Sequence, residues 1–196
     1  AIPPALAGRN VLGLAETGSG KTAAFSLPIL HRLFEDPYGV FSLILTPSRE
    51  LAAQIAKFLR IIGEAQKLRV QCVIGGEDVV RQSLELTNQR PHIVVGTPGR
   101  LVECLDCGLR EMIGNLRCLV LDEADRLLEN ARDDVKDVFG SLKKPQVLLY
   151  SATSTKPLET FSGALKCIKV EGSKASIPKT LVQEYVFCPK RVKLAH

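Results

Sequence analysis

The feature that most constrains the fold is a glycine-rich stretch at residues 15–22, which reads AETGSGKT. An apolar run at 10–14 precedes it, and a helix-like pattern at 23–34 follows it. A strand, a glycine loop and a helix in that order form a phosphate cradle, because the loop N–H groups and the positive helix end both face the anion. Lys21 adds a charge against the β- and γ-phosphates, and the Thr22 hydroxyl suits Mg²⁺. The stretch predicts a nucleotide-binding loop formed by Thr17, Gly18, Ser19, Gly20, Lys21 and Thr22.

Length and composition indicate one globular domain. The chain has 196 residues and 45% hydrophobic content, and its apolar runs are too short to cross a membrane. Residues 1–4 carry no pattern of a signal peptide. The six cysteines fit reduced, intracellular thiols, because the C-x-x-C at 104–107 has no second pair that would complete a zinc site.

The positive charge of the chain is unevenly placed. Ten Lys and Arg and three Asp and Glu follow from residue 140 onward, whereas residues 1–139 carry sixteen basic and eighteen acidic side chains. A solvated basic face explains this imbalance as well as a polyanion ligand does. Net charge alone therefore does not predict nucleic-acid binding.

Apolar strand patterns alternate with helical patterns along the chain. Strands are expected at 10–14, 41–45, 70–74, 92–95, 116–121, 147–150, 167–170 and 181–187, and helices at 23–34, from 49, at 79–86, after 99, near 133–142 and after 157. This alternation is typical of an α/β fold with a mostly parallel sheet and helices on both faces. Ligands of such sheets gather at the carboxyl ends of the strands.

A pair of carboxylates follows the apolar strand 116–121. Asp122 is placed to hold the Mg²⁺ that Thr22 also binds, and Glu123 to orient or deprotonate the water that attacks the γ-phosphate. The alternative is that both acids only cap the next helix. The glycine loop about one hundred residues upstream favours the catalytic interpretation.

A short motif occurs twice, as TPSR at 46–49 and TPGR at 97–100. Each copy follows an apolar strand, with Thr as the expected N-cap and Pro at the first helical position. Capping explains Thr and Pro but not Arg49 and Arg100, because the dipole disfavours a cation in the first turn of a helix. An arriving anion would offset that cost, so both motifs are predicted to hold phosphates of one polyanion. Gly75 and Gly76, at another strand end, permit close approach of a backbone.

Two further observations refine this prediction. Seven Phe, three Tyr and no Trp offer no visible stacking platform, so backbone contact without sequence preference is expected. Ser151 and Thr153, after the strand 147–150, are able to hydrogen-bond the carboxylates at 122–125 and respond to the γ-phosphate. A plain loop before Pro157 is the favoured interpretation of that segment taken alone.

Together these segments closely resemble the DEAD-box ATP-dependent RNA helicases of superfamily two. The resemblance covers nearly the whole chain, with six motifs in order: AETGSGKT, TPSREL, Gly75-Gly76, TPGR, DEAD at 122–125 and SAT at 151–153. It implies a RecA-like P-loop domain at 1–188 that binds ATP and Mg²⁺ through Lys21, Thr22 and Asp122 and hydrolyses ATP with Glu123. It assigns RNA-backbone contact to Pro47, Arg49, Gly75, Gly76, Thr97, Gly99 and Arg100, and coupling to Asp125, Ser151 and Thr153.

The resemblance also sets expectations for the rest of the protein. Ser48 replaces the usual Thr, and residues 130–132 read NAR where the family often has Gly-Phe. The adenine-reading segment is expected before Ala1, and residues 189–196 as the start of a linker to a second RecA-like lobe whose arginine finger is needed for hydrolysis. The isolated chain is thus expected to be nearly inactive and monomeric. A faint similarity to the ribosome-assembly branch suggests the nucleus or nucleolus.

Three other functions stay open at this stage. The first is an ATP-gated RNA clamp or scaffold whose hydrolysis is dispensable, and the second is a DNA-directed translocase of the same superfamily. The third is a metabolic P-loop kinase, in which the paired TPxR motifs have no role.

Overall fold

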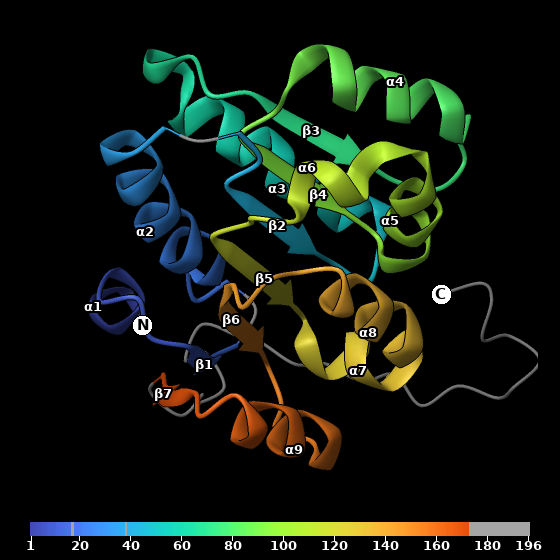
Figure 1. Cartoon of the computed structure of the whole chain (residues 1–196). Coiled ribbons are helices and arrows are strands. Elements are labelled where there is room, and N and C mark those ends of the chain that lie inside the picture. Colours follow the sequence, from blue (N-terminus) through green and yellow to red (C-terminus); the bar gives the residue numbers. More distant parts are fainter. Residues whose placement is uncertain (17, 38, 173–196) are drawn as a thin grey trace, which may run out of the picture.

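The computed structural model describes residues 1–16, 18–37 and 39–172. Within these residues, seven strands form one sheet in the order β3-β4-β2-β5-β6-β1-β7, and each neighbouring pair runs parallel (Figure 1). The strands are β1 (Val11–Leu14), β2 (Ser42–Leu45), β3 (Val70–Val73), β4 (Ile93–Gly96), β5 (Cys118–Asp122), β6 (Gln146–Ser151) and β7 (Ile168–Glu171). The predicted parallel α/β architecture is confirmed.

Helices connect consecutive strands, as parallel pairing requires. They are α1 (Ile2–Leu6), α2 (Lys21–Glu35), α3 (Arg49–Ile62), a short 3₁₀ turn (Glu64–Gln66), α4 (Val79–Gln89), α5 (Pro98–Cys104), α6 (Arg110–Ile113), α7 (Ala124–Asn130), α8 (Arg132–Gly140) and α9 (Lys156–Ala164). A kinked turn at Leu105–Leu109 joins α5 to α6, with Gly108 at φ +101°. None of the helices in the described ranges is both long and apolar enough to cross a membrane.

Alternate strand residues build two cores, one on each face of the sheet. Ile44 and Val120 pack with the apolar sides of α2 and α3, and Ala5 of α1 joins the same core. Leu43 and Leu119 face the opposite side, where α4, α5, α7, α8 and α9 contribute Leu86, Leu101, Leu127, Val138 and Leu158. Burial on both faces explains why the strands are continuously apolar rather than alternating.

The differences from the sequence-based expectations are local. Helices α1 and α7 are too short to show a full amphipathic repeat, and neither was predicted as an element of its own. The last described strand begins at Ile168 rather than Cys167. The strand expected at 181–187 and the predicted domain boundary at 188 lie outside the described residues.

Candidate active site

The predicted site residues meet at one edge of the sheet. Because the strands are parallel, the loops after β1, β5 and β6 leave from the same edge, and these strands are neighbours in the order β5-β6-β1. Strands β3, β4 and β2 are likewise neighbours, and the Gly75–Gly76, TPGR and TPSR segments follow them at that edge. The prediction that Lys21, Asp122 and Arg100 lie along a common edge is confirmed.

The glycine loop leads into the start of α2 and is linked back to its first residue, Ala15, by a hydrogen bond from Lys21. Gly18 and Gly20 have φ of +83° and +87°, which L side chains rarely adopt, and a Cβ on either would meet no atom within 4 Å. The glycines are therefore needed for backbone conformation rather than for space. Lys21 opens α2 after the N-cap Gly20, and its Nζ donates to the Ala15 carbonyl at 2.8 Å. Thr17 lies outside the described residues.

A small cavity adjoins this loop. Its volume is about 160 Å³, and Gly13, Ser19, Gly20, Lys21 and Tyr150 are among its lining residues. A Cβ on Gly13 would lie 2.8 Å from the Tyr150 ring, so glycine in β1 lets the ring pack directly against the strand. Strand β6 thus supports the base of the phosphate loop.

Asp122 is a buried carboxylate with an uncompensated charge. It ends β5 with 4% exposure, and its Oδ1 accepts from the Glu123 backbone N–H at 3.0 Å. Burial raises the pKa of Asp122 to about 6, against the opposing effects of that hydrogen bond and of the Lys21 charge. A buried carboxylate of this kind suits a divalent cation, which would supply the missing positive charge. The carboxylate, together with the half-buried Thr22 hydroxyl in the first turn of α2, therefore fits Mg²⁺.

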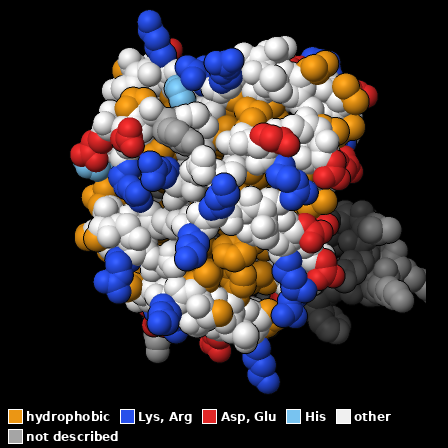
Figure 2. Space-filling view, in the orientation of Figure 1, with side chains coloured by type: hydrophobic (Ala, Val, Ile, Leu, Met, Phe, Trp, Pro, Cys, Tyr) orange, Lys and Arg blue, Asp and Glu red, His pale blue; other side chains and the backbone are white. Residues whose placement is uncertain are grey.

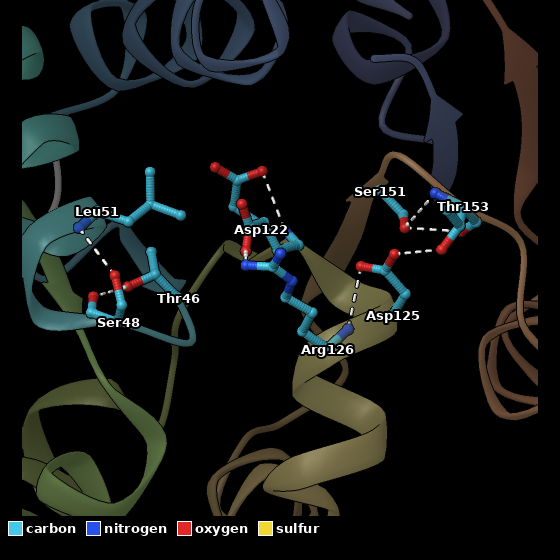
Figure 3. Close-up of polar contacts among 9 residues, drawn as sticks. Thr46, Ser48, Leu51, Asp122, Asp125, Arg126, Ser151 and Thr153 are labelled. Atoms are coloured by element: carbon cyan, nitrogen blue, oxygen red, sulfur yellow. Dashed lines mark hydrogen bonds and ion pairs between the residues drawn. The ribbon is translucent and has the colours of Figure 1, made fainter. Parts of the chain in front are cut away.

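Glu123 stands in a strained backbone position. Its φ and ψ are 50° and 51°, the left-handed region, and it is the N-cap of α7 without a capping side-chain hydrogen bond. The carboxylate instead pairs with Arg126 Nη1 at 2.9 Å, a partly exposed contact that screening weakens. The capping alternative therefore does not describe this side chain. Figure 3 shows Asp122 between the Thr46–Ser48 turn on one side and the Asp125–Thr153 pair on the other.

The SAT segment is bonded to the DEAD segment. Thr153 Oγ1 donates to Asp125 Oδ2, and Asp125 Oδ1 accepts from the Arg126 N–H at 3.0 Å (Figure 3). Ser151 Oγ shapes the turn by donating to the Thr153 carbonyl and accepting from the Thr153 N–H. Burial alone would raise the pKa of Asp125, but these hydrogen bonds together lower it. The predicted contact between the two motifs is confirmed for Thr153, and the segment is also, as the alternative interpretation expected, a loop that leads to α9.

The two TPxR motifs enter their helices in different registers. In the second copy Thr97 is the N-cap, without a side-chain capping bond, and Pro98 is the first helical residue, as predicted. In the first copy the N-cap is Ser48, whose Oγ accepts from the Leu51 N–H at 3.2 Å, while Thr46 Oγ1 donates to the Ser48 carbonyl. The prediction that Thr46 caps and Pro47 opens the helix is wrong, because Ser48 has a capping hydroxyl. Gly99 has none at the equivalent position.

Arg49 lies against the Gly75–Gly76 backbone. A Cβ on Gly76 would lie 2.7 Å from Arg49 Nη1, and one on Gly75 would lie 3.0 Å from Nη2. Gly76 also has φ +98°. The glycines therefore make room for a guanidinium of this same chain, a role that the sequence did not indicate.

Arg100 is held by the segment that follows the two glycines. Its Nη1 donates to the Glu77 carbonyl at 2.7 Å and to Gln82 Oε1 at 3.3 Å, and its Nε lies 2.8 Å from a Glu103 carboxylate oxygen. Only 11% of the side chain is exposed. Gln82 and Glu77 are thus site residues that sequence reasoning missed, because a buried Gln in a helix has no distinctive pattern. Gly99 is exposed, near the Asp134 carboxylate.

The comparisons with known proteins agree with this geometry. The chain is 45% identical to "DEAD-box ATP-dependent RNA helicase 36" of Arabidopsis thaliana, over 98% of this chain and 40% of the relative. It is also 45% identical to "Probable ATP-dependent RNA helicase DDX49" of Homo sapiens, over 100% of this chain and 42% of the relative. The chain thus spans less than half the length of these relatives.

Solved structures show the same fold. The yeast DEAD-box splicing factor Prp28 superposes with a TM-score of 0.78 at 30% identity, over 86% of this chain and 43% of that one. A hypothetical ATP-dependent RNA helicase from Sulfolobus tokodaii gives 0.75 at 33% identity, over 87% of this chain and 50% of that one. The profile of the DEAD/DEAH box helicase family matches residues 1–161. The chain, with its glycine loop, its buried aspartate and its paired TPxR motifs at one sheet edge, belongs to the DEAD/DEAH box helicase family.

Proposed function

We propose that this chain is the first RecA-like lobe of an ATP-dependent RNA helicase, with residues 1–188 forming the lobe and 189–196 leading to a second lobe. The supporting observation is the convergence of two groups of strand ends on one edge of the sheet. The ends of β1, β5 and β6 would hold ATP, and those of β2, β3 and β4 would hold the RNA backbone. The lobe would act as a monomer on RNA duplexes or ribonucleoprotein, in ribosome assembly as the faint sequence similarity suggests.

The phosphates of ATP would bind in the glycine loop. Lys21 Nζ, which donates to the Ala15 carbonyl at 2.8 Å, would then donate to a phosphate oxygen instead. A phosphate oxygen is the better acceptor for an ammonium group, because the phosphate carries a negative charge whereas the carbonyl is neutral. Thr22 and Asp122 would hold Mg²⁺, which would neutralise charge on the phosphates when bound.

Glu123 would accept a proton from the attacking water or orient it. Glu123 is the N-cap of α7, where its backbone is left-handed, and its carboxylate pairs with the exposed Arg126. Exchange of that partner for water is inexpensive, since a surface ion pair contributes about 0–1 kcal/mol. The strained backbone at Glu123 fits a residue placed for chemistry rather than for packing.

RNA would lie across the ends of β2, β3 and β4. Arg49 is exposed and already oriented by the Gly75–Gly76 backbone, so it would meet a phosphate without further ordering. Arg100 would act chiefly as a positioning residue that holds the Glu77–Gln82 segment, because its guanidinium has partners within the chain. Pro47, Thr97 and Gly99 would bring backbone groups to the RNA, which implies contact without base preference.

The Thr153–Asp125 hydrogen bond would couple two segments within the ATP-binding group. It joins the loop after β6 to the first turn of α7, two residues beyond Glu123, so movement of either segment changes the other. The second lobe would complete hydrolysis with an arginine finger, a contribution of roughly 10³–10⁵ in rate. The lobe alone would therefore bind nucleotide weakly and hydrolyse very little.

The experiment has two stages. In the first, a fluorescent ATP analogue is titrated into the 196-residue chain with and without Mg²⁺, and binding that depends on Mg²⁺ and Lys21 is expected. In the second, the lobe is joined to a helicase second lobe, and turnover is measured with RNA and with DNA. Stimulation by DNA as strong as by RNA would favour the translocase. Undiminished duplex release by the joined Glu123→Gln protein over many cycles would favour the clamp.

A further inference from the structure

A second cavity lies at the opposite edge of the sheet. It measures about 850 Å³, against about 160 Å³ for the cavity beside the glycine loop. Its walls come from the residues just before β1, β5 and β6, with further residues from α2 and α8. Strands β5 and β6 have five and six residues, so about 17–20 Å of sheet separates this amino-edge groove from the site described above.

The amino-edge groove is strongly basic. Four of its twelve lining residues are cationic, namely Arg32, Arg117, Lys143 and Lys144, and no lining residue is acidic. Lys143 and Lys144 are exposed and come from the loop between α8 and β6. Figure 2 shows Lys and Arg side chains gathered over the region where β5 and β6 begin. Arg117 has an exposed ion pair with Asp36 at 3.8 Å, and Arg32 donates to Gln146. The exposed Lys143 and Lys144 add like charges to the same concave surface, and an anion bound in the groove would relieve their mutual repulsion.

The floor of the groove is rigid, and its hydrogen bonds are made within the chain. Gln146 Nε2 donates to the Ala5 and Arg9 carbonyls at 2.8 and 2.7 Å, and Gln146 Oε1 accepts from Arg32. The Val147 N–H donates to Asn10 Oδ1 at 2.8 Å, and Asn10 Nδ2 donates to the Leu165 carbonyl at 2.8 Å. Arg32 is therefore fixed in the wall of the groove before any ligand arrives.

The hydrogen bonds in the floor of the groove favour a phosphate backbone over an acidic peptide as its ligand. The backbone N–H groups of Leu116, Arg117 and Gln146 already donate to the carbonyls of Ile113, Phe41 and Arg117. A peptide that relies on main-chain pairing would find these donors occupied. A phosphate backbone needs only the side-chain cations, because Lys and Arg bind its oxygens irrespective of sequence.

We propose that the amino-edge groove binds the sugar–phosphate backbone of a second RNA segment, separate from the one at the carboxyl edge. The choice of RNA over another polyanion rests on the proposed function. The half-buried Phe139 and Leu165, with the buried Leu116 behind them, give the groove an apolar wall against which a ribose packs. A lobe with two such surfaces holds RNA at both the amino and the carboxyl edge of the sheet. It therefore retains its substrate when the carboxyl-edge site releases a strand.

The test uses fluorescence anisotropy of a 20-nucleotide oligouridine with the 196-residue chain over a range of salt concentrations. The double variant Lys143→Glu/Lys144→Glu is compared with Lys57→Glu/Lys67→Glu, which makes the same charge change at exposed positions of another surface. The groove variant is expected to bind roughly tenfold more weakly than this control. Loss of two phosphate contacts reduces the slope of log affinity against log salt by about 1.4. Equal weakening by both double variants would overturn the proposal.

Two further arms separate the remaining outcomes. Reagent acetylation of Lys143 and Lys144 in the unmodified chain is expected to fall when oligouridine is bound, and the milder Lys143→Gln/Lys144→Gln variant serves if the glutamate variant unfolds. If poly-glutamate binding depends on these lysines and oligouridine binding does not, the groove takes an acidic protein segment and the proposal is wrong. Arg49→Ala tests the carboxyl edge alone. If the groove variant weakens oligouridine binding and Arg49→Ala does not, the result contradicts the proposed function and supports the groove proposal.

Discussion

The two halves of the carboxyl edge differ in how their charged groups are satisfied. At the ends of β1 and β5, Lys21 donates to a loop carbonyl, and the buried Asp122 accepts one backbone hydrogen bond at 3.0 Å. At the ends of β2 and β4, Arg49 lies against two glycines, and Arg100 has three contacts and 11% exposure. The proposed nucleotide half, at the ends of β1, β5 and β6, contains charges that would be stabilised by counter-charges. The proposed RNA half, at the ends of β2, β3 and β4, is already held by contacts within the chain.

This difference suggests how the lobe orders its ligands. A site with uncompensated charge gains most from a charged ligand, because the ligand supplies the stabilisation that the apo protein lacks. A pre-assembled surface changes little on binding and gains affinity through lower ordering costs. Substitutions in the nucleotide half should therefore act on ligand affinity and pH dependence, and those in the RNA half also on stability.

The largest effect is expected for Lys21→Ala. Loss of a charge-assisted contact with two phosphates should weaken Mg²⁺-ATP binding by about 100-fold or more. Stability should change by less than about 1 kcal/mol, since the apo side chain makes one partly exposed hydrogen bond. Fluorescent-nucleotide titration and urea unfolding measure the two quantities. Lys57→Ala is the matched control, and a Lys21 variant that loses stability instead of affinity would break the comparison.

The next effect concerns Asp122→Asn in the absence of nucleotide and Mg²⁺. The folded-state pKa, raised to about 6 from the ordinary 3.8, means that the protonated form stabilises the fold and that this stability is lost as pH rises through about 6. Asn mimics the protonated form, so the variant should be about 2 kcal/mol more stable than the parent at pH 8. The advantage should shrink toward pH 4.

Urea unfolding at several pH values tests this expectation, with the exposed Glu129→Gln as the control. If Asp122→Asn is no more stable than the parent at pH 8, the carboxylate is already compensated in the apo protein. The proposed nucleotide half would then lack the uncompensated charge that distinguishes it from the proposed RNA half.

The sequence predicted the placement of residues in the proposed nucleotide half well, because that placement depends on the local order of strand, loop and helix. A strand, a glycine loop and a helix specify where Lys21 goes, and an apolar strand delivers Asp122 to the same edge once the sheet is parallel. Even the link between Thr153 and Asp125 was within reach, because both follow neighbouring strands.

In the proposed RNA half, the sequence predicted which motifs lie at the sheet edge but not which side chains contact one another. The partners of Arg100 are 18 and 23 residues away along the chain, in a segment with no recognisable pattern. The register of the first TPxR helix depends on competition between Thr46 and Ser48 for the cap, which small energy differences decide. Residues that act through long-range side-chain contacts leave no local periodicity, so Gln82 was missed.

A pair of arginine variants sharpens the comparison within the RNA half. Arg100→Ala should destabilise the chain by about 1.5 kcal/mol, because it removes the donor to the Glu77 carbonyl and to Gln82 Oε1 in a mostly buried setting. Arg49→Ala should cost much less stability, since its side chain is exposed, yet weaken RNA binding at low salt. Urea unfolding and oligouridine anisotropy give both quantities for each variant.

Partial rescue identifies the role of Arg100. A Gln82→Ala/Arg100→Ala double variant should be less destabilised than the sum of the single variants, since the two side chains share a hydrogen bond. Additive losses would mean that Arg100 acts independently of the Gln82 segment. A positioning role would then be untenable, and direct phosphate contact would account better for the motif.

The smallest effect is expected for Thr153→Val, which breaks the link between the loop after β6 and the first turn of α7. The variant keeps the side-chain shape but loses the hydrogen bond to Asp125, which should cost about 1 kcal/mol. Because hydrogen bonds lower the pKa of Asp125, they contribute stability above its ordinary pKa that is lost as pH falls through the lower folded value. The variant should thus lose stability at a higher pH on acidification than the parent. The control is Thr160→Val, at an exposed position on α9. If the variant and the parent lose stability at the same pH on acidification, Asp125 is held by the Arg126 N–H rather than by the SAT segment.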